Sequence, residues 1–377
     1  MKKTNISFLL ILLITFITQA CNAPEKVPPV PESELQTEDP MMQTIMDSVA
    51  SKMRYYPDQI QFAFAFVDGD STWYLGVLRE NDILKEITNA DSVYEIGSIS
   101  KVFTGILLAD MVVKEELQLE TTLEDLGIET RTDFTFTLEE LSTHTSGMPR
   151  IPSNMRWSAM FHQDNPYVNY DDDKLRDYLK NDLTTQSRPG TDYAYSNLGA
   201  GVLGYALQVK SDFDYEQLIQ QVITTPLSMD QTTTDRSRIK NELVQGRDYN
   251  GKPTPNWDFN ALIAAGGILS SPRDMIKFAK AQWDTTNTAI QLSQLPRHPV
   301  NSGMQIGLGW HIIYRNDGSA WLWHNGGTGG YRSTIYIDEV KKKALVILSN
   351  LSAGHSRSRL MDALGQDIME ILIKDES

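Results

Sequence analysis

The chain has 377 residues, of which 41% are hydrophobic and 22% are charged, so it is long enough to bury a sizeable core in one large domain or two closely packed ones. Its formal net charge is −15, and such a surface repels phosphate backbones, which argues against nucleic-acid binding. The single cysteine excludes an internal disulfide and a cysteine-rich metal site. No metal-binding or cofactor motif appears, and we expect a monomer that uses neither.

Residues 1–20 have the pattern of a secretory signal, because Lys2 and Lys3 precede a short apolar run. Cys21 follows directly, and this placement resembles a bacterial lipoprotein processing site, at which the cysteine becomes the lipidated first residue. Ordinary signal-peptidase cleavage nearby is the alternative. Residues 21–40 carry five prolines among polar side chains and are predicted to form an extended tether. The sequence therefore predicts export to the periplasm or cell envelope, with a lipid anchor on Cys21.

Three segments after the tether predict the start of an α+β domain. Residues 41–53 have apolar side chains at helical spacing. Residues 61–67 and 72–78 are apolar and aromatic runs separated by Asp-Gly-Asp-Ser, which predicts a β-hairpin. A helix followed by a hairpin suits a layered arrangement in which helices flank an antiparallel sheet.

A serine and a lysine stand three residues apart in the segment Tyr-Glu-Ile-Gly-Ser-Ile-Ser-Lys. Gly97 allows a sharp turn, and apolar residues recur at helical spacing from 101 to 113. Ser98 and Lys101 therefore share one helix face. Serine needs a base to become a nucleophile, and lysine is one only if burial or nearby positive charge lowers its pKa well below about 10.4. The sequence predicts Ser98 as the nucleophile and Lys101 as its base.

Residues 119–295 are predicted to form a mainly helical lobe inserted between two α/β parts, at about 41–118 and 296–375. Thr137 begins a capping box that leads into Ser-Thr-His-Thr-Ser-Gly. His144, within that stretch, is expected to dock a helix end on the core rather than to perform chemistry. The simplest architecture is one catalytic domain with a helical insertion.

A Tyr-x-Asn triplet, formed by Tyr195 and Asn197, lies between a Pro-Gly turn and an apolar helix. A phenol beside a lysine can shuttle a proton if its pKa is lowered from about 10. Triplets at Tyr167 and Tyr314 also match, but the first lies in an acidic loop and the second in a predicted strand. We therefore assign the second proton-handling role to Tyr195 and a substrate-binding role to Asn197.

The end of the chain has the most strand-like pattern. Residues 320–324, 331–337 and 344–348 are apolar or alternating runs, and an amphipathic helix follows at 357–373. These three strands can join the N-terminal hairpin in one antiparallel sheet. The first strand ends in His-Asn-Gly-Gly, at 324–327, where glycines would let a substrate lie against the strand edge.

Three motifs occur in a recognisable order: S-x-x-K at Ser98, Y-x-N at Tyr195 and H-x-G at His324. Together with the eight-residue context of Ser98, they resemble the class C β-lactamases and related penicillin-recognising serine hydrolases. The resemblance covers residues 41–375. It implies an α+β fold with an antiparallel sheet flanked by helices, and an acyl-enzyme formed on Ser98.

The resemblance also implies roles for the residues at the end of the predicted strand. His324, Asn325 and Gly326 take the positions of the family's Lys-Thr-Gly box and are expected to bind substrate. The backbone N–H groups of Ser98 and Gly327 would form the oxyanion hole, in which one donor contributes about 2.7–4 kcal/mol of barrier lowering.

One departure from the family pattern concerns substrate choice. Class C β-lactamases usually carry a lysine in the third box, which helps to bind the substrate's carboxylate, whereas His324 would be mostly uncharged at pH 7. Arg332 could replace that lysine as a carboxylate clamp, and an ordinary surface arginine is the alternative. The departure therefore bears on β-lactam hydrolysis and not on the acyl-enzyme chemistry.

The expected activity is serine acyl hydrolysis of a small molecule or peptide, namely β-lactams or D-Ala-D-Ala peptides. Relatives with histidine in the third box include D-Ala-D-Ala peptidases, D-amino-acid amidases and esterases, so an esterase or amidase is one alternative. A second alternative is an envelope protein that binds penicillin or muropeptide without turnover.

Overall fold

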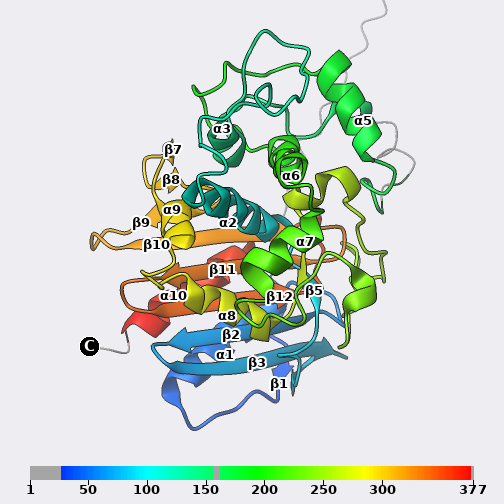
Figure 1. Cartoon of the computed structure of the whole chain (residues 1–377). Coiled ribbons are helices and arrows are strands. Elements are labelled where there is room, and N and C mark those ends of the chain that lie inside the picture. Colours follow the sequence, from blue (N-terminus) through cyan, green and yellow to red (C-terminus); the bar gives the residue numbers. More distant parts are fainter. Residues whose placement is uncertain (1–26, 156–161, 163, 375–377) are drawn as a thin grey trace, which may run out of the picture.

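The computed structural model describes residues 27–155, 162 and 164–374. Within this part, a ten-stranded sheet crosses the molecule (Figure 1). In spatial order its strands are β1 (Glu32–Ser33), β4 (Ile83–Ile87), β3 (Ser71–Glu80), β2 (Gln61–Asp68), β12 (Lys343–Ser349), β11 (Arg332–Asp338), β10 (Ala320–Gly327), β9 (His311–Tyr314), β8 (Met304–Ile306) and β7 (His298–Asn301). Every pairing is antiparallel except that of β1 with β4, so the predicted sheet is confirmed.

The two ends of the chain meet at the centre of this sheet. Strand β2 pairs with β12 from Asp68 opposite Lys343 to Phe62 opposite Ser349, which joins the predicted hairpin to the predicted C-terminal strands. The sequence did not predict β4, β7 or β8, and it indicated β9 only through the strand expected at Tyr314. Each of these segments has only three to five residues, too few to establish an alternating pattern.

Helices cover both faces of the sheet. Helices α1 (Pro40–Met53) and α10 (Leu360–Lys374) pack on one face, and α2 (Ser100–Val113) and α8 (Pro272–Ala281) lie on the other. Side chains alternate along β2, so Phe62, Phe64 and Phe66 meet the α1 and α10 side, whereas Ala63 and Ala65 meet the α2 and α8 side. The small alanines let α8 approach the sheet closely.

Two predicted boundaries differ from the structure. Within the predicted tether of residues 21–40, β1 pairs with β4 and Leu35 is only 3% exposed, so the last part of this segment docks on the sheet. Helix α8 lies inside the segment predicted as the helical lobe but packs on β2 and β12. The signal and Cys21 lie outside the described residues. None of the described helices is long and apolar enough to cross a membrane.

The remaining helices form a lobe around α2 (Figure 1). They are α3 (Leu138–Ser142), α5 (Asp172–Asp177), α6 (Asn197–Ser211), α7 (Tyr215–Ile219) and α9 (Thr288–Gln294). In this lobe α3, α5 and α6 lie above α2, and α7 and α9 lie beside or below it. The capping box predicted at Thr137 is present, with Glu140 N donating to Thr137 Oγ1 and Thr137 N donating to Glu140. Helix α3 therefore begins where the sequence indicated.

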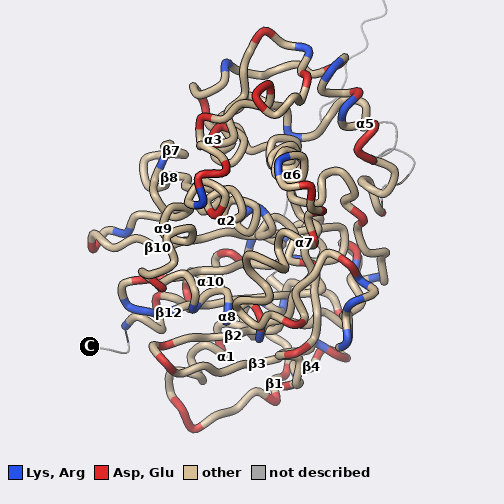
Figure 2. Tube along the Cα trace, in the orientation of Figure 1, with Lys and Arg blue, Asp and Glu red and all other residues tan. Residues whose placement is uncertain are grey.

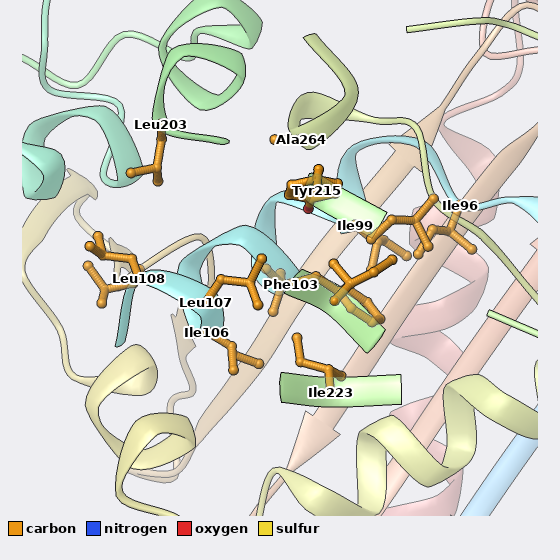
Figure 3. Close-up of a cluster of buried hydrophobic side chains, with 14 of the residues drawn as sticks. Ile96, Ile99, Phe103, Ile106, Leu107, Leu108, Leu203, Tyr215, Ile223 and Ala264 are labelled. Atoms are coloured by element: carbon orange, nitrogen blue, oxygen red, sulfur yellow. The ribbon is translucent and has the colours of Figure 1, made fainter. Parts of the chain in front are cut away.

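Helix α2 lies between the sheet and this lobe and is buried on nearly every side. Figure 3 shows Phe103 and Leu107 of α2 among Tyr215 and Ile223 from the lobe. Phe103 also stacks on Phe278 of α8 with ring centroids 4.2 Å apart. A helix held from both sides gives the residues at its N-terminus fixed positions, and Ser98 and Lys101 are among them.

Candidate active site

Ser98 lies in a single 3₁₀ turn, Gly97–Ile99, that leads directly into α2. Gly97 has φ +52°, a left-handed conformation that favours glycine. The Ser100 hydroxyl donates to Gly97 O at 2.7 Å and accepts from Ile268 N at 3.1 Å. The turn is therefore fixed to the strand pair formed by β5 (Tyr94–Glu95) and β6 (Leu269–Ser270).

Lys101 meets Ser98 as the three-residue spacing predicted. Its Nζ lies 3.1 Å from Ser98 Oγ and donates to Ala265 O at 2.6 Å. The Lys101 side chain is buried. Burial lowers the pKa of the amine well below its usual value, and the positive charge of Arg150 lowers it further. An amine with a lowered pKa can be neutral near pH 7 and accept a proton.

Tyr195 is the third group at Ser98, because the Ser98 side chain acts to lower the pKa of its phenol and its ring centre lies 4.9 Å from Lys101 Nζ. The condition that its pKa be lowered for a proton shuttle is not met. Burial raises the pKa of Tyr195 to about 12, although the Ser98 side chain and the positive charge of Arg150 oppose the rise. Desolvation outweighs both because a phenolate would lose its hydration in this site. Tyr195 is therefore a neutral phenol at pH 7 that can donate or relay a proton.

The segment before α6 holds Tyr195 in place. Ser196 caps α6 by accepting from Gly199 N at 2.8 Å, and Ser196 N donates to His144 Nδ1 at 3.3 Å. His144 O accepts from Ala194 N at 2.8 Å, and the imidazole ring lies 4.4 Å from the Tyr195 ring. His144 thus docks this segment on the core, in line with the structural role expected for it.

Asn197 stands at the first turn of α6, beside Tyr195. Its Nδ2 donates to Tyr167 Oη at 3.1 Å, whereas its Oδ1 is buried and has no hydrogen-bond partner among the described residues. A buried acceptor without a partner is costly in the free protein, so it is available for a substrate N–H. Tyr167 belongs to a triplet that the sequence analysis set aside, and it contributes by orienting Asn197.

The end of β10 packs directly against the Ser98 turn. A Cβ on Gly326 would lie 1.9 Å from Ile96 O, and one on Gly97 would lie 2.5 Å from Gly327 N. Ser333 Oγ donates to the same Ile96 O at 2.7 Å, which joins β11 to this contact. The backbone N–H of Gly327 therefore lies against Gly97, the residue that precedes Ser98.

His324 faces the same side of the sheet but is buried rather than presented to solvent. Its Nδ1 is hydrogen-bonded to Asn325 O at 2.7 Å, and its Nε2 has no partner within the described part of the chain. Burial holds the pKa of His324 well below its usual value, so the ring is neutral at pH 7. The ring of His311 lies 5.1 Å away and is hydrogen-bonded to Tyr193 Oη at 2.9 Å. No sequence motif marks His311 or Tyr193.

Asn325 and Arg332 lie on the opposite face of the sheet, and the prediction that their side chains bind substrate is not supported. Asn325 Nδ2 donates to Asp362 Oδ2 at 3.0 Å, and Arg332 forms an ion pair with the same carboxylate of α10. The reason is the alternation of side chains along a strand, which turns Asn325 away when His324 and Gly326 face Ser98. Arg332 is thus engaged with Asp362 and not with the site.

Arg150 is the main residue of the site that the sequence did not reveal. It follows a Gly-Met-Pro turn, and its guanidinium carbon lies 5.0 Å from the centre of the Tyr195 ring. No motif marks it, because its position depends on a loop that meets α6. Among the residues that the structure describes, no three His, Cys, Asp or Glu side chains are arranged to hold a metal ion.

Comparison with known proteins places this geometry in context. A family model described as Beta-lactamase matches residues 52–369. The D-alanyl-D-alanine-carboxypeptidase/endopeptidase AmpH of Escherichia coli K12 is 26% identical over 318 residues, which cover 78% of this chain and 80% of that protein. Penicillin-binding protein 4 of Amycolatopsis lactamdurans is 25% identical over 315 residues, with coverages of 76% and 79%.

A beta-lactamase of Escherichia coli K12 is 26% identical over 323 residues, covering 74% of this chain and 80% of that protein. A crystal structure of a beta-lactamase/D-alanine carboxypeptidase from Pseudomonas syringae aligns with a TM-score of 0.71 at 19% identity, covering 88% of this chain and 99% of the other. At that identity the structural match concerns the fold alone, and it agrees with the predicted α+β architecture.

Proposed function

The chain belongs to the beta-lactamase family, and we propose that it is a serine hydrolase that forms an acyl-enzyme on Ser98 with β-lactams or D-Ala-D-Ala peptides. The observation that carries the proposal is the convergence of two proton-handling groups on one hydroxyl. Lys101 Nζ lies 3.1 Å from Ser98 Oγ and 4.9 Å from the centre of the Tyr195 ring, and the Ser98 side chain acts on the pKa of the Tyr195 phenol. The relatives named above carry carboxypeptidase, penicillin-binding and beta-lactamase names, which support this substrate class.

In acylation, Lys101 accepts the Ser98 proton as Oγ attacks the substrate carbonyl carbon. The carbonyl oxygen becomes an oxyanion, and the backbone N–H groups of Ser98 and Gly327 donate to it. When the tetrahedral intermediate collapses, the carbon–nitrogen bond breaks and the leaving nitrogen takes a proton. Tyr195 relays that proton from the Lys101 ammonium, because its own high pKa keeps it protonated at the start and the end of the step.

In deacylation, a water molecule takes the place of the leaving group. Lys101, neutral again after giving up its proton, accepts one through Tyr195 as the water oxygen attacks the ester carbon. The same two amides stabilise the second oxyanion, and the proton returns to Ser98 Oγ when the ester bond breaks. The rate of this step decides whether the protein behaves as a β-lactamase or as a penicillin-labelled peptidase.

The test uses the soluble domain and Ser98→Ala, each incubated with a fluorescent penicillin and a chromogenic cephalosporin. A stable adduct without turnover, seen only with Ser98 present, supports a peptidase-like enzyme, and rapid turnover supports a β-lactamase. Labelling or turnover that is equal in Ser98→Ala overturns the proposal. No reaction with any substrate favours a protein that binds penicillin or muropeptide without turnover.

An esterase or D-amino-acid amidase is the second candidate, and one feature of the site favours it. His324 is neutral where related β-lactamases carry a lysine, and Arg332 is paired with Asp362. Neither can supply a free positive charge for a substrate carboxylate. Hydrolysis of a nitrophenyl ester by the wild type and not by Ser98→Ala, with no penicillin adduct, would select this candidate.

We also propose that the protein acts as an exported monomer, anchored to the membrane by a lipid on Cys21. The support is the order of the N-terminal segments: an apolar signal-like run, then Cys21, then a proline-rich segment before the first paired strand. Metabolic labelling with a fatty acid should mark the wild type and not Cys21→Ser. Equal labelling of both, or cleavage at another residue, would contradict the anchor.

A further inference from the structure

Arg150 differs from the other cations around Ser98 because no carboxylate of the described residues forms an ion pair with it, and its guanidinium contacts only the face of the Tyr195 ring. Arg332 forms an ion pair with Asp362, and the buried Lys101 amine is hydrogen-bonded to Ser98 and Ala265. The Arg150 side chain is exposed and forms no ion pair within the part of the chain that the structure describes. A guanidinium remains charged at any pH at which the protein would act.

The backbone of Arg150 is held rigidly at the wall of the site. Arg150 O accepts from Asn197 N at 3.0 Å and from Leu198 N at 3.2 Å, and Pro149 O accepts from Ser196 Oγ at 2.7 Å. These bonds tie the loop to the start of α6, the same element that positions Tyr195. The Arg150 guanidinium lies 5.0 Å from the centre of the Tyr195 ring, and Lys101 Nζ lies 4.9 Å from the same centre.

The charge of Arg150 reaches the groups that handle protons. It contributes to the lowered pKa of Lys101 and opposes the raised pKa values of Tyr195, Tyr193 and Tyr167. The rest of the protein carries an excess of acid, and Figure 2 shows Asp and Glu from the turns of the helical lobe to the edge near β1. An anionic substrate would be repelled by this surface unless one local positive charge received it.

We propose that Arg150 is a specificity-determining residue whose guanidinium binds a carboxylate of the substrate while Ser98 attacks the carbonyl. This inference rests on the proposed function. A planar guanidinium can donate two parallel N–H bonds to a carboxylate, which is the geometry needed to orient a substrate as well as to hold it. The Arg150 guanidinium would also replace the positive charge that a lysine at position 324 would supply, because it lies on the α6 side of the site instead of on β10.

The test compares Arg150→Gln, Arg150→Lys and wild type on two pairs of substrates that differ by one carboxylate. The first pair is a D-Ala-D-Ala peptide and its C-terminal amide, and the second is a penicillin with a carboxylate in its side chain and benzylpenicillin. We expect Arg150→Gln to lower the charged-to-neutral ratio of kcat/KM by about tenfold or more in at least one pair, mainly through KM. Arg150→Lys should retain part of the ratio. The responding pair shows which end of the substrate the arginine binds.

Arg188→Gln is the matched control, because Arg188 is also exposed, lies in the same lobe and has no part in the pKa shifts of Lys101 or Tyr195. It should leave both ratios as in the wild type. Equal loss on charged and neutral substrates in Arg150→Gln would overturn the proposal, since a positioning role acts on both alike. A selective loss in Arg332→Met with none in Arg150→Gln would also overturn it.

Failure of this inference is distinguishable from failure of the proposed function. If Ser98→Ala abolishes the reaction while Arg150→Gln leaves both ratios unchanged, the acyl-enzyme mechanism stands and the role of Arg150 is refuted. If the wild type forms no adduct and turns over no member of either pair, the proposed function fails, and the carboxylate-binding role that rests on it is rejected as well.

Discussion

Gly97→Ala is predicted to separate the nucleophile from its second oxyanion donor. Gly97 has φ +52°, a conformation that costs a residue with a side chain about 1–2 kcal/mol. The added Cβ would lie 2.5 Å from Gly327 N, closer than a carbon and a nitrogen can approach without bonding. Either the turn or the end of β10 must therefore move, and both movements draw the Gly327 amide away from Ser98.

The magnitude follows from these two effects. Loss of one oxyanion donor costs about 2.7–4 kcal/mol, so the acylation rate should fall by about 10²–10³-fold. The backbone strain should lower the free energy of unfolding by about 1–2 kcal/mol, which leaves most of the protein folded. Acid-quenched labelling with a fluorescent penicillin measures the first quantity, and urea unfolding measures the second.

Gly69→Ala is the matched control for this prediction. Gly69 has φ +55° in the turn between β2 and β3, and a Cβ there would meet nothing within 4 Å. It should lose stability as Gly97→Ala does but acylate at the wild-type rate. If Gly97→Ala acylates within about threefold of Gly69→Ala, the Gly327 amide does not stabilise the oxyanion and the reasoning is refuted.

Three further predictions address the base, the buried histidines and the α10 ion pair. Lys101→Met should slow acylation by about 10²–10⁴-fold in quenched-flow labelling. Its free energy of unfolding should be unchanged or higher, because no buried amine remains. Acylation at the wild-type rate would exclude Lys101 as the base. The pKa of His311 is lowered to about 4, so between pH 6.5 and 4 the unfolded chain binds a proton that the folded protein does not, and stability falls as the pH drops. The loss should be about 1.4 kcal/mol per pH unit, and His311→Gln should reduce the slope of urea stability against pH by about that amount; an unchanged slope contradicts the assignment. Arg332→Met should lower the free energy of unfolding by about 1–2 kcal/mol, because the partly buried Asp362 carboxylate loses its ion pair, while the ratio of acid to amide substrate stays constant.

The parts of the site that were predictable are those set by local spacing. Ser98 and Lys101 meet because residues three apart share a helix face, and the capping box at Thr137 fixes where α3 begins. The hairpin also follows from a short turn between two apolar runs. Each of these features depends on fewer than about ten consecutive residues, so the sequence determines it directly.

The features of the site that the sequence did not predict correctly depend on contacts between segments that are distant in the chain. The pKa of Tyr195 rises because several segments bury the phenol, and no single segment shows that burial. Arg332 was expected at the substrate, yet it faces α10, where Asp362 is its partner. Strand alternation alone could have shown that Asn325 faces away from Ser98 once His324 faces toward it. Arg150 could not be found, since its place in the site results from a loop that packs on α6.

The central claim is that Ser98 Oγ becomes covalently acylated, and rapid acid quenching followed by peptide mass mapping tests it most directly. With benzylpenicillin, the account predicts that the peptide containing Ser98 gains the mass of one whole penicillin, and that the corresponding peptide of Ser98→Ala gains nothing. An adduct on any other residue, or turnover of penicillin by Ser98→Ala, would contradict the account.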